Sequence, residues 1–468
     1  MRGLRAPKTD GASSDGMVGY ARFFGDPMFH LVSMFFALPF ASPAFAQDFQ
    51  FAEEETSLFQ AQTGTLFNYG IGRPTVIYDT VRDEYVMMVE GRLTPNTHYD
   101  PSDYPNCSTV FGMMRATSGD GVDWTLDPEP VLVPRPGGYE ACAAAHPNMI
   151  FDASTEIYHL YFKSEQPSNI CDQGPVPAWG CAQFTGVGYA ESDDGGVTWD
   201  ISEMPAISNE QLNYDGHLSG LGYPTVLVGE DTWFMWVSRI ENVTFTSSLS
   251  LATSTDGGDT WYVDPTPVLE PGFSDWAQHE ITSPVAFCEA GGDEFSMFFA
   301  GNTRDNPSTE EANEEVWGLA YATSIDGYDW AFENEPYYRW NMAEVTYDGD
   351  ANWPHMTFLK VGDDQFVVYH TERVTDETGT WAHMFVGSTT ADWEPSDVDP
   401  RICRTRLPDT DSGDTDDFTD DTDVDDKKGC GCQAIPGALG WMWPLVPLLM
   451  VGRRRSHSRH ATDVLEQR

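Results

Sequence analysis

The sequence is poor in basic residues and shows no helical periodicity of any length between its two ends. It holds 25 Lys and Arg against 74 Asp and Glu, which gives a formal net charge of −49 at pH 7. A chain this acidic repels phosphate groups, so nucleic acid and anionic membrane surfaces are excluded as partners. Without amphipathic helical stretches, the chain is expected to fold from β-strands. Its 15 Trp and 13% aromatic residues suit an all-β core and sugar-stacking surfaces equally well.

Long apolar runs are also scarce, and the first of them lies near the N-terminal end. Residues 28–45 are apolar, follow several basic residues and lead into Ala44-Phe45-Ala46, a sequence typical of a cleavage site. The run is short for a membrane span and polar chain follows it. Residues 1–46 are therefore predicted to be a secretory signal peptide with a long leader, so the protein is expected to be exported. Translation from Met17 or Met28 is the alternative explanation of that leader.

The second apolar run, residues 434–452, follows an acidic stretch near the other end. Residues 409–429 are rich in Asp with almost nothing to bury, so we expect an acidic disordered linker there. The order of Cys430-Gly431-Cys432, the apolar run and three arginines resembles the C-terminal sorting signals of myxobacteria and their relatives. This resemblance implies that residues 430–468 are processed near the cysteines and retain the protein at the cell surface. The alternative is a plain membrane anchor, and in both cases this segment is the only expected membrane contact.

Cysteine is sparse, with eight residues in 468. Six fall in the domain expected between residues 47 and 408, and an even number in an oxidising compartment is typical of disulfides. The short loop between Cys171 and Cys181 makes these two the expected pair. None of the six has the spacing of metal ligands, so no metal site and no cofactor is expected. The six are Cys107, Cys142, Cys171, Cys181, Cys288 and Cys403.

One short motif recurs four times and indicates a repeat architecture. It reads Ser-x-Asp-Gly with a Trp a few residues later, as in residues 252–261. In such a hairpin turn the Asp carboxylate accepts hydrogen bonds from nearby backbone N–H groups, Gly supplies a positive φ, and Trp begins the next strand. The copies centre on Asp120, Asp194, Asp256 and Asp326, and residues 388–393 form a fifth copy that lacks Asp-Gly.

A second repeated element, a Pro that opens a β-rich run, precedes each turn. Pro is tolerated at the first position of a strand because its missing N–H lies outside the hydrogen-bonded ladder. Three further short strands follow each Pro run, so the chain predicts an all-β fold, a five-bladed β-propeller with four antiparallel strands per blade over residues 47–408. A strand within residues 57–69 is expected to close the ring with the last blade. Two β-sandwiches are the alternative, but they do not explain the fivefold alternation. The prolines are Pro74, Pro147, Pro224, Pro284 and Pro354.

These motifs resemble two groups of carbohydrate-active proteins. The Pro-x-Val opening, the Met-Trp-Val or Met-Phe-Phe second strand and the Ala-Thr-Ser-x-Asp-Gly turn resemble the five-bladed glycoside hydrolases of the arabinanase, invertase and levansucrase type. The Ser-x-Asp-Gly-Gly-x-Thr-Trp copies also resemble the Asp boxes of sialidases. The resemblance covers roughly residues 65–400 and implies the propeller fold more strongly than it implies an activity, because the shared motifs belong to the scaffold.

In such a propeller the opening strands line a central channel, so the residues flanking the five prolines are expected to face a funnel where ligand binds. Several of the few arginines also stand at matching places in different units, and they could converge on one anionic ligand. The alternative is that each Arg pairs with an acidic neighbour such as Glu90 or Glu241. The candidate substrate-binding residues are Arg73, His146, Tyr223, Arg239, Arg304, Trp353, His355 and Arg373.

Carboxylates near the funnel are the candidate catalytic residues, because glycoside hydrolysis needs a protonated acid and a second carboxylate. Glu280 is the candidate general acid, since it leads into an opening strand and Trp276 nearby could raise its pKa. Asp215, or alternatively Asp275, is the candidate second carboxylate. Arg73 stands directly before the first Pro, where the resemblance implies a general-base Asp, and this departure weakens an arabinanase-type mechanism.

The sequence therefore supports two functions from different classes. The first is an exported, monomeric cell-surface propeller that acts on extracellular carbohydrate as a glycoside hydrolase. The second is a non-catalytic propeller that presents glycan- or protein-binding loops on an acidic stalk. The replacement of the expected base by Arg73 favours the second, and the acidic and aromatic residues around the funnel favour the first.

Overall fold

The computed structural model describes twelve segments of the chain, which all lie in one compact unit bounded by Met1 and Pro408. No helix in these segments is long and apolar enough to span a membrane. The predictions for residues 1–46, 409–429 and 430–468 fall outside them. The described segments are residues 56–60, 71–167, 182–212, 218–241, 246–289, 294–303, 316–332, 335–341, 356–362, 365–376, 379–388 and 401–403.

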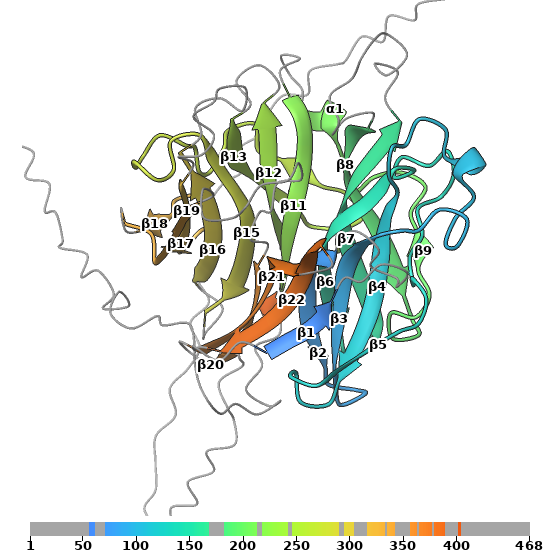
Figure 1. Cartoon of the computed structure of the whole chain (residues 1–468). Coiled ribbons are helices and arrows are strands. Elements are labelled where there is room, and N and C mark those ends of the chain that lie inside the picture. The colour runs from blue at the N-terminus through green and yellow to red at the C-terminus, as the bar shows by residue number, and fades with distance from the viewer. Residues whose placement is uncertain are drawn as a thin grey trace, which may run out of the picture. The chain divides into compact units, whose positions relative to one another are not determined.

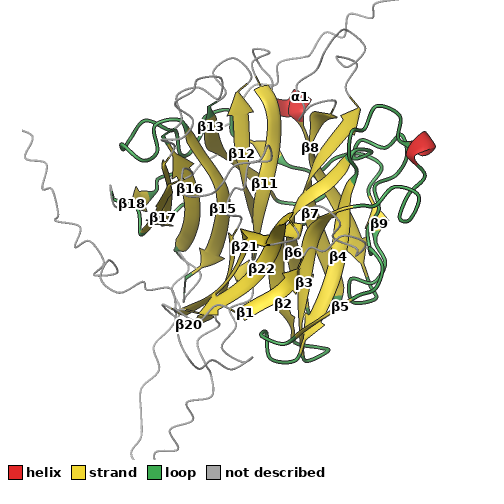
Figure 2. Ribbon diagram, in the orientation of Figure 1, coloured by secondary structure: helices red, strands yellow, loops and turns green. Residues whose placement is uncertain are grey.

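The described chain is nearly all β, as predicted (Figure 2). Its helices are one turn each, η1 (Pro101–Asp103) and α1 (Asn209–Leu212). The strands form successive antiparallel groups, each made of a long strand, two partners and usually a short fourth strand. The first three groups are β2 (Ile71–Asp79), β3 (Glu84–Arg92), β4 (Phe111–Ser118) and β5 (Trp124–Leu126); β6 (Ala143–Asp152), β7 (Ile157–Pro167), β8 (Ala182–Ser192) and β9 (Asp200–Ile201); and β11 (Leu218–Gly229), β12 (Trp233–Glu241), β13 (Ser247–Ser254) and β14 (Tyr262–Val263).

The remaining strands continue this pattern. A strand from the N-terminal part of the domain, β1 (Thr56–Gln60), pairs antiparallel with β22, so the strand expected near residues 57–69 is present and joins the last group. Figure 1 shows this group, in orange, beside the blue strands of the first group. The other strands are β10 (Ile207–Ser208), β15 (Glu280–Cys288), β16 (Phe295–Asn302), β17 (Val316–Ser324), β18 (Ala331–Phe332), β19 (Tyr338–Asn341), β20 (Met356–Gly362), β21 (Gln365–Asp376), β22 (Gly379–Ser388) and β23 (Ile402–Cys403).

The first strand of each group contacts the first strands of its neighbours. β2 contacts β6 and β20, β11 contacts β6 and β15, and β15 also contacts β20. Hydrogen bonds nevertheless divide the described strands into three separate sheets and do not form one closed ring. We call β2, β6, β11, β15 and β20 the inner strands.

Polar side chains directly after the prolines connect neighbouring inner strands through hydrogen bonds. In three successive pairs, a buried Thr or Asn accepts a hydrogen bond from a backbone N–H of the next inner strand. Such bonds satisfy backbone donors that no ladder reaches. The pairs are Thr75 Oγ1 with Met149 N at 3.1 Å, Asn148 Oδ1 with Val226 N at 3.0 Å, and Thr225 Oγ1 with Ala286 N at 3.1 Å.

The hydrophobic core lies between consecutive groups and not within one layer. Five buried clusters each join side chains of two neighbouring groups, and one of them joins the last group to the first through Tyr369 and Tyr85. A strand that is covered on both faces reads as a continuous apolar run, which explains the burial of seven consecutive residues in β3. Packing therefore couples every group to two others.

The four repeated turns have the hydrogen bonding that their sequence predicts. In the third copy, Gly258 N donates to Ser254 Oγ at 2.9 Å, Ser254 Oγ donates to Asp256 Oδ1 at 2.7 Å, and Thr260 N donates to the same oxygen at 2.9 Å. The Thr260 hydroxyl and N–H, together with Ser254, lower the pKa of Asp256 to about 2. The other copies repeat the Ser–Asp and Gly–Ser bonds at Asp120, Asp194 and Asp326.

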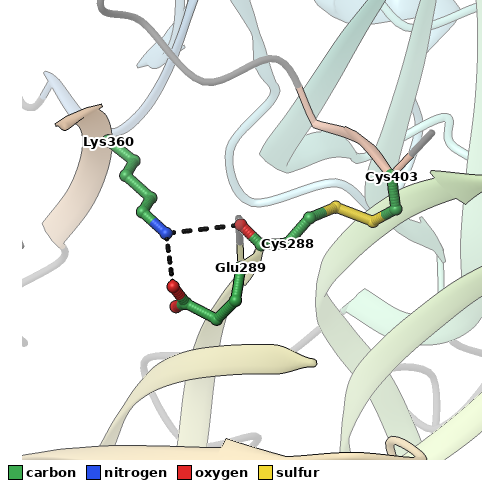
Figure 3. Close-up of a disulfide and its surroundings, with 4 residues drawn as sticks. All are labelled: Cys288, Glu289, Lys360 and Cys403. Atoms are coloured by element: carbon green, nitrogen blue, oxygen red, sulfur yellow. Dashed lines mark hydrogen bonds and ion pairs between the residues drawn. A yellow bond between two sulfur atoms is a disulfide. The ribbon is translucent and has the colours of Figure 1, made fainter. Parts of the chain in front are cut away.

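Two disulfides join distant parts of the described chain, Cys107–Cys142 and Cys288–Cys403. The second one fixes β23 at the end of β15, and Figure 3 shows it beside the Lys360 side chain. The predicted pair Cys171 and Cys181 lies outside the described residues.

Candidate functional site

The candidate site is a depression lined by residues from all five inner strands. It encloses about 420 Å³ of space, open solvent at its mouth included. The lining residues cluster at the prolines that open the strands. They are Arg73, Pro74, His146, Pro147, Asn148, Tyr223, Pro224, Ser283, Pro284, Val285, Met356 and Thr357.

A repeated backbone distortion shapes this depression. The residue before the Pro is left-handed in four inner strands, with φ of 51° at Arg73, His146 and Tyr223 and 55° at Ser283. The strand register slips at each of these points, as in a β-bulge. A left-handed conformation costs a non-glycine residue about 1–2 kcal/mol, and bulges of this kind redirect side chains next to functional sites. We call these four residues the pre-proline ledge.

Glu90, near the end of β3, holds two residues of the ledge in place. Its Oε1 forms an ion pair with Arg73, and its Oε2 accepts a hydrogen bond from the backbone N–H of His146 at 2.8 Å. Burial lowers the pKa of Arg73, but the charge of Glu90 and its hydrogen bond outweigh burial, so the net shift is upward. The guanidinium is therefore charged at every accessible pH and points at the depression.

Aromatic packing completes this side of the site. The rings of His146 and Tyr223 lie 3.8 Å apart between centroids, and the Arg73 guanidinium lies 5.7 Å from the centre of the Tyr223 ring. Burial, reinforced by Glu90 and Glu280 and opposed by Arg73, raises the pKa of Tyr223. Tyr223 is therefore neutral at physiological pH, and its hydroxyl acts as a hydrogen-bond group.

A second ion pair stands beside this cluster on β7. Lys163 Nζ lies 2.5 Å from Glu165 Oε1 and 4.3 Å from the centre of the Phe184 ring. A Cβ added at Gly222, just before Tyr223, would meet Lys163 Cδ at 3.3 Å, so glycine leaves room for the lysine. Two groups thus bring Arg73, Lys163 and two glutamates to one side of the site.

Glu280, the predicted general acid, begins β15 and is half-buried. The Asn302 side-chain amide donates to its Oε2 at 2.7 Å, which orients the carboxylate. Its charge contributes to the raised pKa of Tyr223, so it lies within electrostatic reach of the ledge. Trp276 is fully buried and packs against Phe273 and Phe299 in the core.

Glu280, Asp275 and Arg239 are not among the residues that line the depression. Asp275 is exposed, and Gln278 of the same loop lies 3.5 Å from its carboxylate. Arg239 forms an ion pair with Glu241 at 2.8 Å, the alternative that the sequence left open, as Arg73 does with Glu90. Asp215, Arg304, Trp353 and His355 lie outside the described residues, and of Arg373 only the backbone, in β21, is described.

Two features were missed by sequence reasoning. Ser283 is the fourth ledge residue, and Glu90 is the shared partner of two ledge residues and not merely a neighbour of one. The signal for Ser283 was its place directly before Pro284. The register of β3 was needed for Glu90, because Gly72 lies opposite Glu90 across the strand pair. Among the described residues no group of acidic, His or Cys side chains is arranged to hold a metal ion.

Comparison with solved structures identifies the type of fold. No family model and no curated protein matches the chain. A candidate glycoside hydrolase from Parabacteroides distasonis has a TM-score of 0.50 at 12% identity, over 73% of this chain and 97% of that one. The chain has the propeller-like fold of glycoside hydrolases. A structure of the GH130 family of mannoside phosphorylases, which contains glycoside hydrolases that target β-1,2 mannosidic linkages in Candida mannan, also has a TM-score of 0.50 at 12% identity, over 73% and 94%.

An endo-arabinase from Bacteroides thetaiotaomicron is similar over 72% of this chain and 98% of its own, with 11% identity. Its TM-score of 0.42 is too low to add to the argument. At these identities the likeness concerns the fold alone, and the activity has to be argued from the site.

Proposed function

We propose that this protein acts on carbohydrate in the central depression as a glycoside hydrolase. The observation that carries the proposal is the pre-proline ledge, where four strands share one strained backbone but present Arg73, His146, Tyr223 and Ser283. Strain of this kind persists only where the surrounding structure maintains it, and it concentrates at functional sites. An aromatic ring, an imidazole and a charged guanidinium around a small hollow suit the stacking face and the hydroxyls of a sugar.

In the proposed reaction Glu280 protonates the glycosidic oxygen as the bond to the anomeric carbon breaks, and water takes the leaving group's place at that carbon. A second carboxylate removes the proton from the water, or attacks first as nucleophile. Asp215 remains the proposed second carboxylate because it precedes Tyr223 in the chain. The hydrogen bond from Asn302 orients the Glu280 carboxylate. Asp215 is preferred to the alternative, Asp275, because Asp275 is exposed.

We further propose that the strand groups are the blades of one five-bladed propeller, with Asp turns like those of sialidases. The ring of contacts among the inner strands and the five clusters between groups support this count. We also propose that the protein is exported as a monomer and that its C-terminal segment retains it at the cell surface. Labelling of intact cells with a membrane-impermeant reagent tests it: a protein that is labelled only after lysis is not at the surface.

A non-catalytic carbohydrate-binding propeller is the second candidate, and one observation favours it. Arg73 occupies the place where the resemblance implies a base, and Glu90 is engaged in an ion pair with it. In this case the depression binds a sugar without turnover.

A glycan-hydrolysis screen with matched variants decides between the two. We expect the purified protein to release sugar, Glu280→Gln to reduce the rate by about 10²–10⁴-fold with binding retained, and Asp275→Asn to keep the activity. Glycan binding by all three proteins without any release would establish the binding protein. Absence of both release and binding across the screen would contradict both candidates.

A further inference from the structure

The last described segment, residues 401–403, runs along the inner strands and is fixed at two points. Val228 N in β11 donates to the Arg401 carbonyl at 3.0 Å, and Cys403 forms the disulfide with Cys288. This anchoring places the Arg401 side chain inside the protein, where only 8% of the residue is exposed. Its Nη1 donates to Thr75 Oγ1 at 3.4 Å.

Arg401 differs from seven other basic residues of the described chain, each of which forms an ion pair with a carboxylate. Lys360 is comparably buried, at 3% exposure, but it forms an ion pair with Glu289 at 2.8 Å (Figure 3). For Arg401 the described residues supply no carboxylate within ion-pair distance, although the chain carries a net charge of −49. The other pairs are Arg73–Glu90, Arg82–Asp79, Arg115–Asp127, Arg135–Glu140, Lys163–Glu165 and Arg239–Glu241.

The hydroxyl beside Arg401 also needs an acceptor. Thr75 is 1% exposed, and its Oγ1 accepts hydrogen bonds from both Met149 N and Arg401 Nη1. A hydroxyl has two acceptor positions and one proton to donate. Both acceptor positions are used, and no hydrogen bond from this proton is formed to any described residue.

No described residue accepts a hydrogen bond from the remaining N–H groups of Arg401 or from the Thr75 hydroxyl. A guanidinium has five N–H groups, and the described contacts of Arg401 use one of them. A buried charge without a counter-ion is costly, and burial lowers the pKa of Arg401 to about 10. An anion would satisfy the guanidinium and the hydroxyl together.

We propose that Arg401 and Thr75 bind a small inorganic anion, a halide or an oxyanion of sulfate size, between the inner strands. Thr75 directly follows Pro74, so this site adjoins the depression but is built from different side chains. The anion would take the place that a carboxylate has beside the seven paired cations. The proposal does not depend on the carbohydrate activity.

Thermal unfolding at constant ionic strength tests the site. Sodium gluconate, whose anion is much larger than a halide or sulfate, is replaced stepwise by sodium chloride, sodium bromide or sodium sulfate. We expect a saturable rise in Tm of about 2 °C with at least one of the three, for a ligand reaching about ten times its Kd. Arg401→Met should abolish this rise, whereas Arg82→Met, which removes an arginine from a turn, should keep it.

Crystals grown with bromide supply a test that does not depend on a variant that folds. An anomalous peak within hydrogen-bond distance of the Arg401 guanidinium and Thr75 Oγ1 supports the site. If Arg401→Met does not fold, Thr75→Val should weaken the salt response several-fold. The proposal is overturned by water alone at this position together with a Tm that does not respond to the three anions, or by equal responses of wild type and Arg401→Met.

Discussion

The Asp turns and the pre-proline ledge are both repeated in successive strand groups, but they differ in whether the side chains recur together with the backbone conformation. In the turns both the backbone and the side chains recur, with the same Ser–Asp bond in all four copies. In the ledge only the backbone recurs, with φ between 51° and 55° at four residues of four different types. A turn that keeps its side chains serves the architecture, whereas a constant backbone that carries varied side chains is what a binding site requires.

The two regions also meet the demand for positive φ differently. The turns use glycine, for example Gly257 at 78° and Gly327 at 77°, where a missing Cβ removes the strain. The ledge accepts strain at residues with side chains and holds it with hydrogen bonds. Glu90 accepts from the N–H of His146, and Ser238, at the corresponding place in β12, accepts from the N–H of Ser283 at 3.2 Å.

The largest effect is expected when the support of the ledge is removed. Glu90→Ala leaves the Arg73 guanidinium without its partner and His146 N without its acceptor. Because Glu90 is 6% exposed, we expect a loss of about 3 kcal/mol in the free energy of unfolding, measured by urea titration. Glu241→Ala, which removes the more exposed partner of Arg239, should cost less than about 1 kcal/mol. Equal losses would show that Glu90 is an ordinary ion-pair residue.

A glycine inside one turn should have the next largest effect. Gly258 has φ of 92°, and an added Cβ would lie 2.6 Å from Tyr161 Oη. Gly258→Ala is therefore expected to cost about 2–4 kcal/mol, through backbone strain and overpacking. Its neighbour Gly257 also has positive φ but no atom within 4 Å of the added Cβ, so Gly257→Ala should cost about 1–2 kcal/mol. Urea titration of both variants checks this, and a reversed order would contradict the packing described for the turn.

A smaller effect on stability is expected from low pH, through the carboxylate of Asp256. The pKa of Asp256 is about 2 in the folded protein, below the value of about 3.9 for an unfolded chain. The stability contributed by this carboxylate is therefore complete above pH 4 and is lost as pH falls from about 4 to about 2. Asp256→Asn should lose less Tm over that interval than wild type, and Asp231→Asn, in a turn without the Ser–Asp–Gly network, should behave like wild type. Identical pH profiles for all three proteins would exclude a stabilising role of the turn carboxylate.

The smallest effect on stability is expected from glycine substitutions in the pre-proline ledge. These variants distinguish the role of backbone strain from the role of the side chains. Ser283→Gly removes the strain of a left-handed backbone at a residue with a Cβ, but it also gives the unfolded chain more conformational freedom. Because these two effects oppose each other, the free energy of unfolding should change by less than about 1 kcal/mol. Sugar binding measured by calorimetry should also be nearly unchanged. His146→Gly makes the same backbone change but removes a ring stacked on Tyr223, and it should weaken sugar binding clearly. Equal binding by the two variants would place the ligand elsewhere.

The repeat pattern carried most of the information about the fold. Prolines at fixed places and Ser-x-Asp-Gly turns predicted an all-β chain with successive antiparallel groups, because both motifs act through bonds within a few residues. The strand near residues 57–69 was predicted on a different ground, as a segment that closes the ring with the last group, and β1 does pair with β22. The pairing of Cys288 with Cys403 could not be predicted, because it joins residues 115 positions apart that only the fold brings together.

For the candidate site, the sequence alone determined which residues precede the inner-strand prolines, and hence that Arg73, His146 and Tyr223 face one region. Only the tertiary structure decided which hydrogen bonds, ion pairs and ring contacts these residues form. The pairing of Glu90 with two of them depends on strand register, and the burial of Arg401 depends on a disulfide and on contacts between distant strands. Local motifs fix the backbone through short-range hydrogen bonds and sterics. Buried charged side chains are paired by groups that are distant in the chain, so these ion pairs form only when the chain folds.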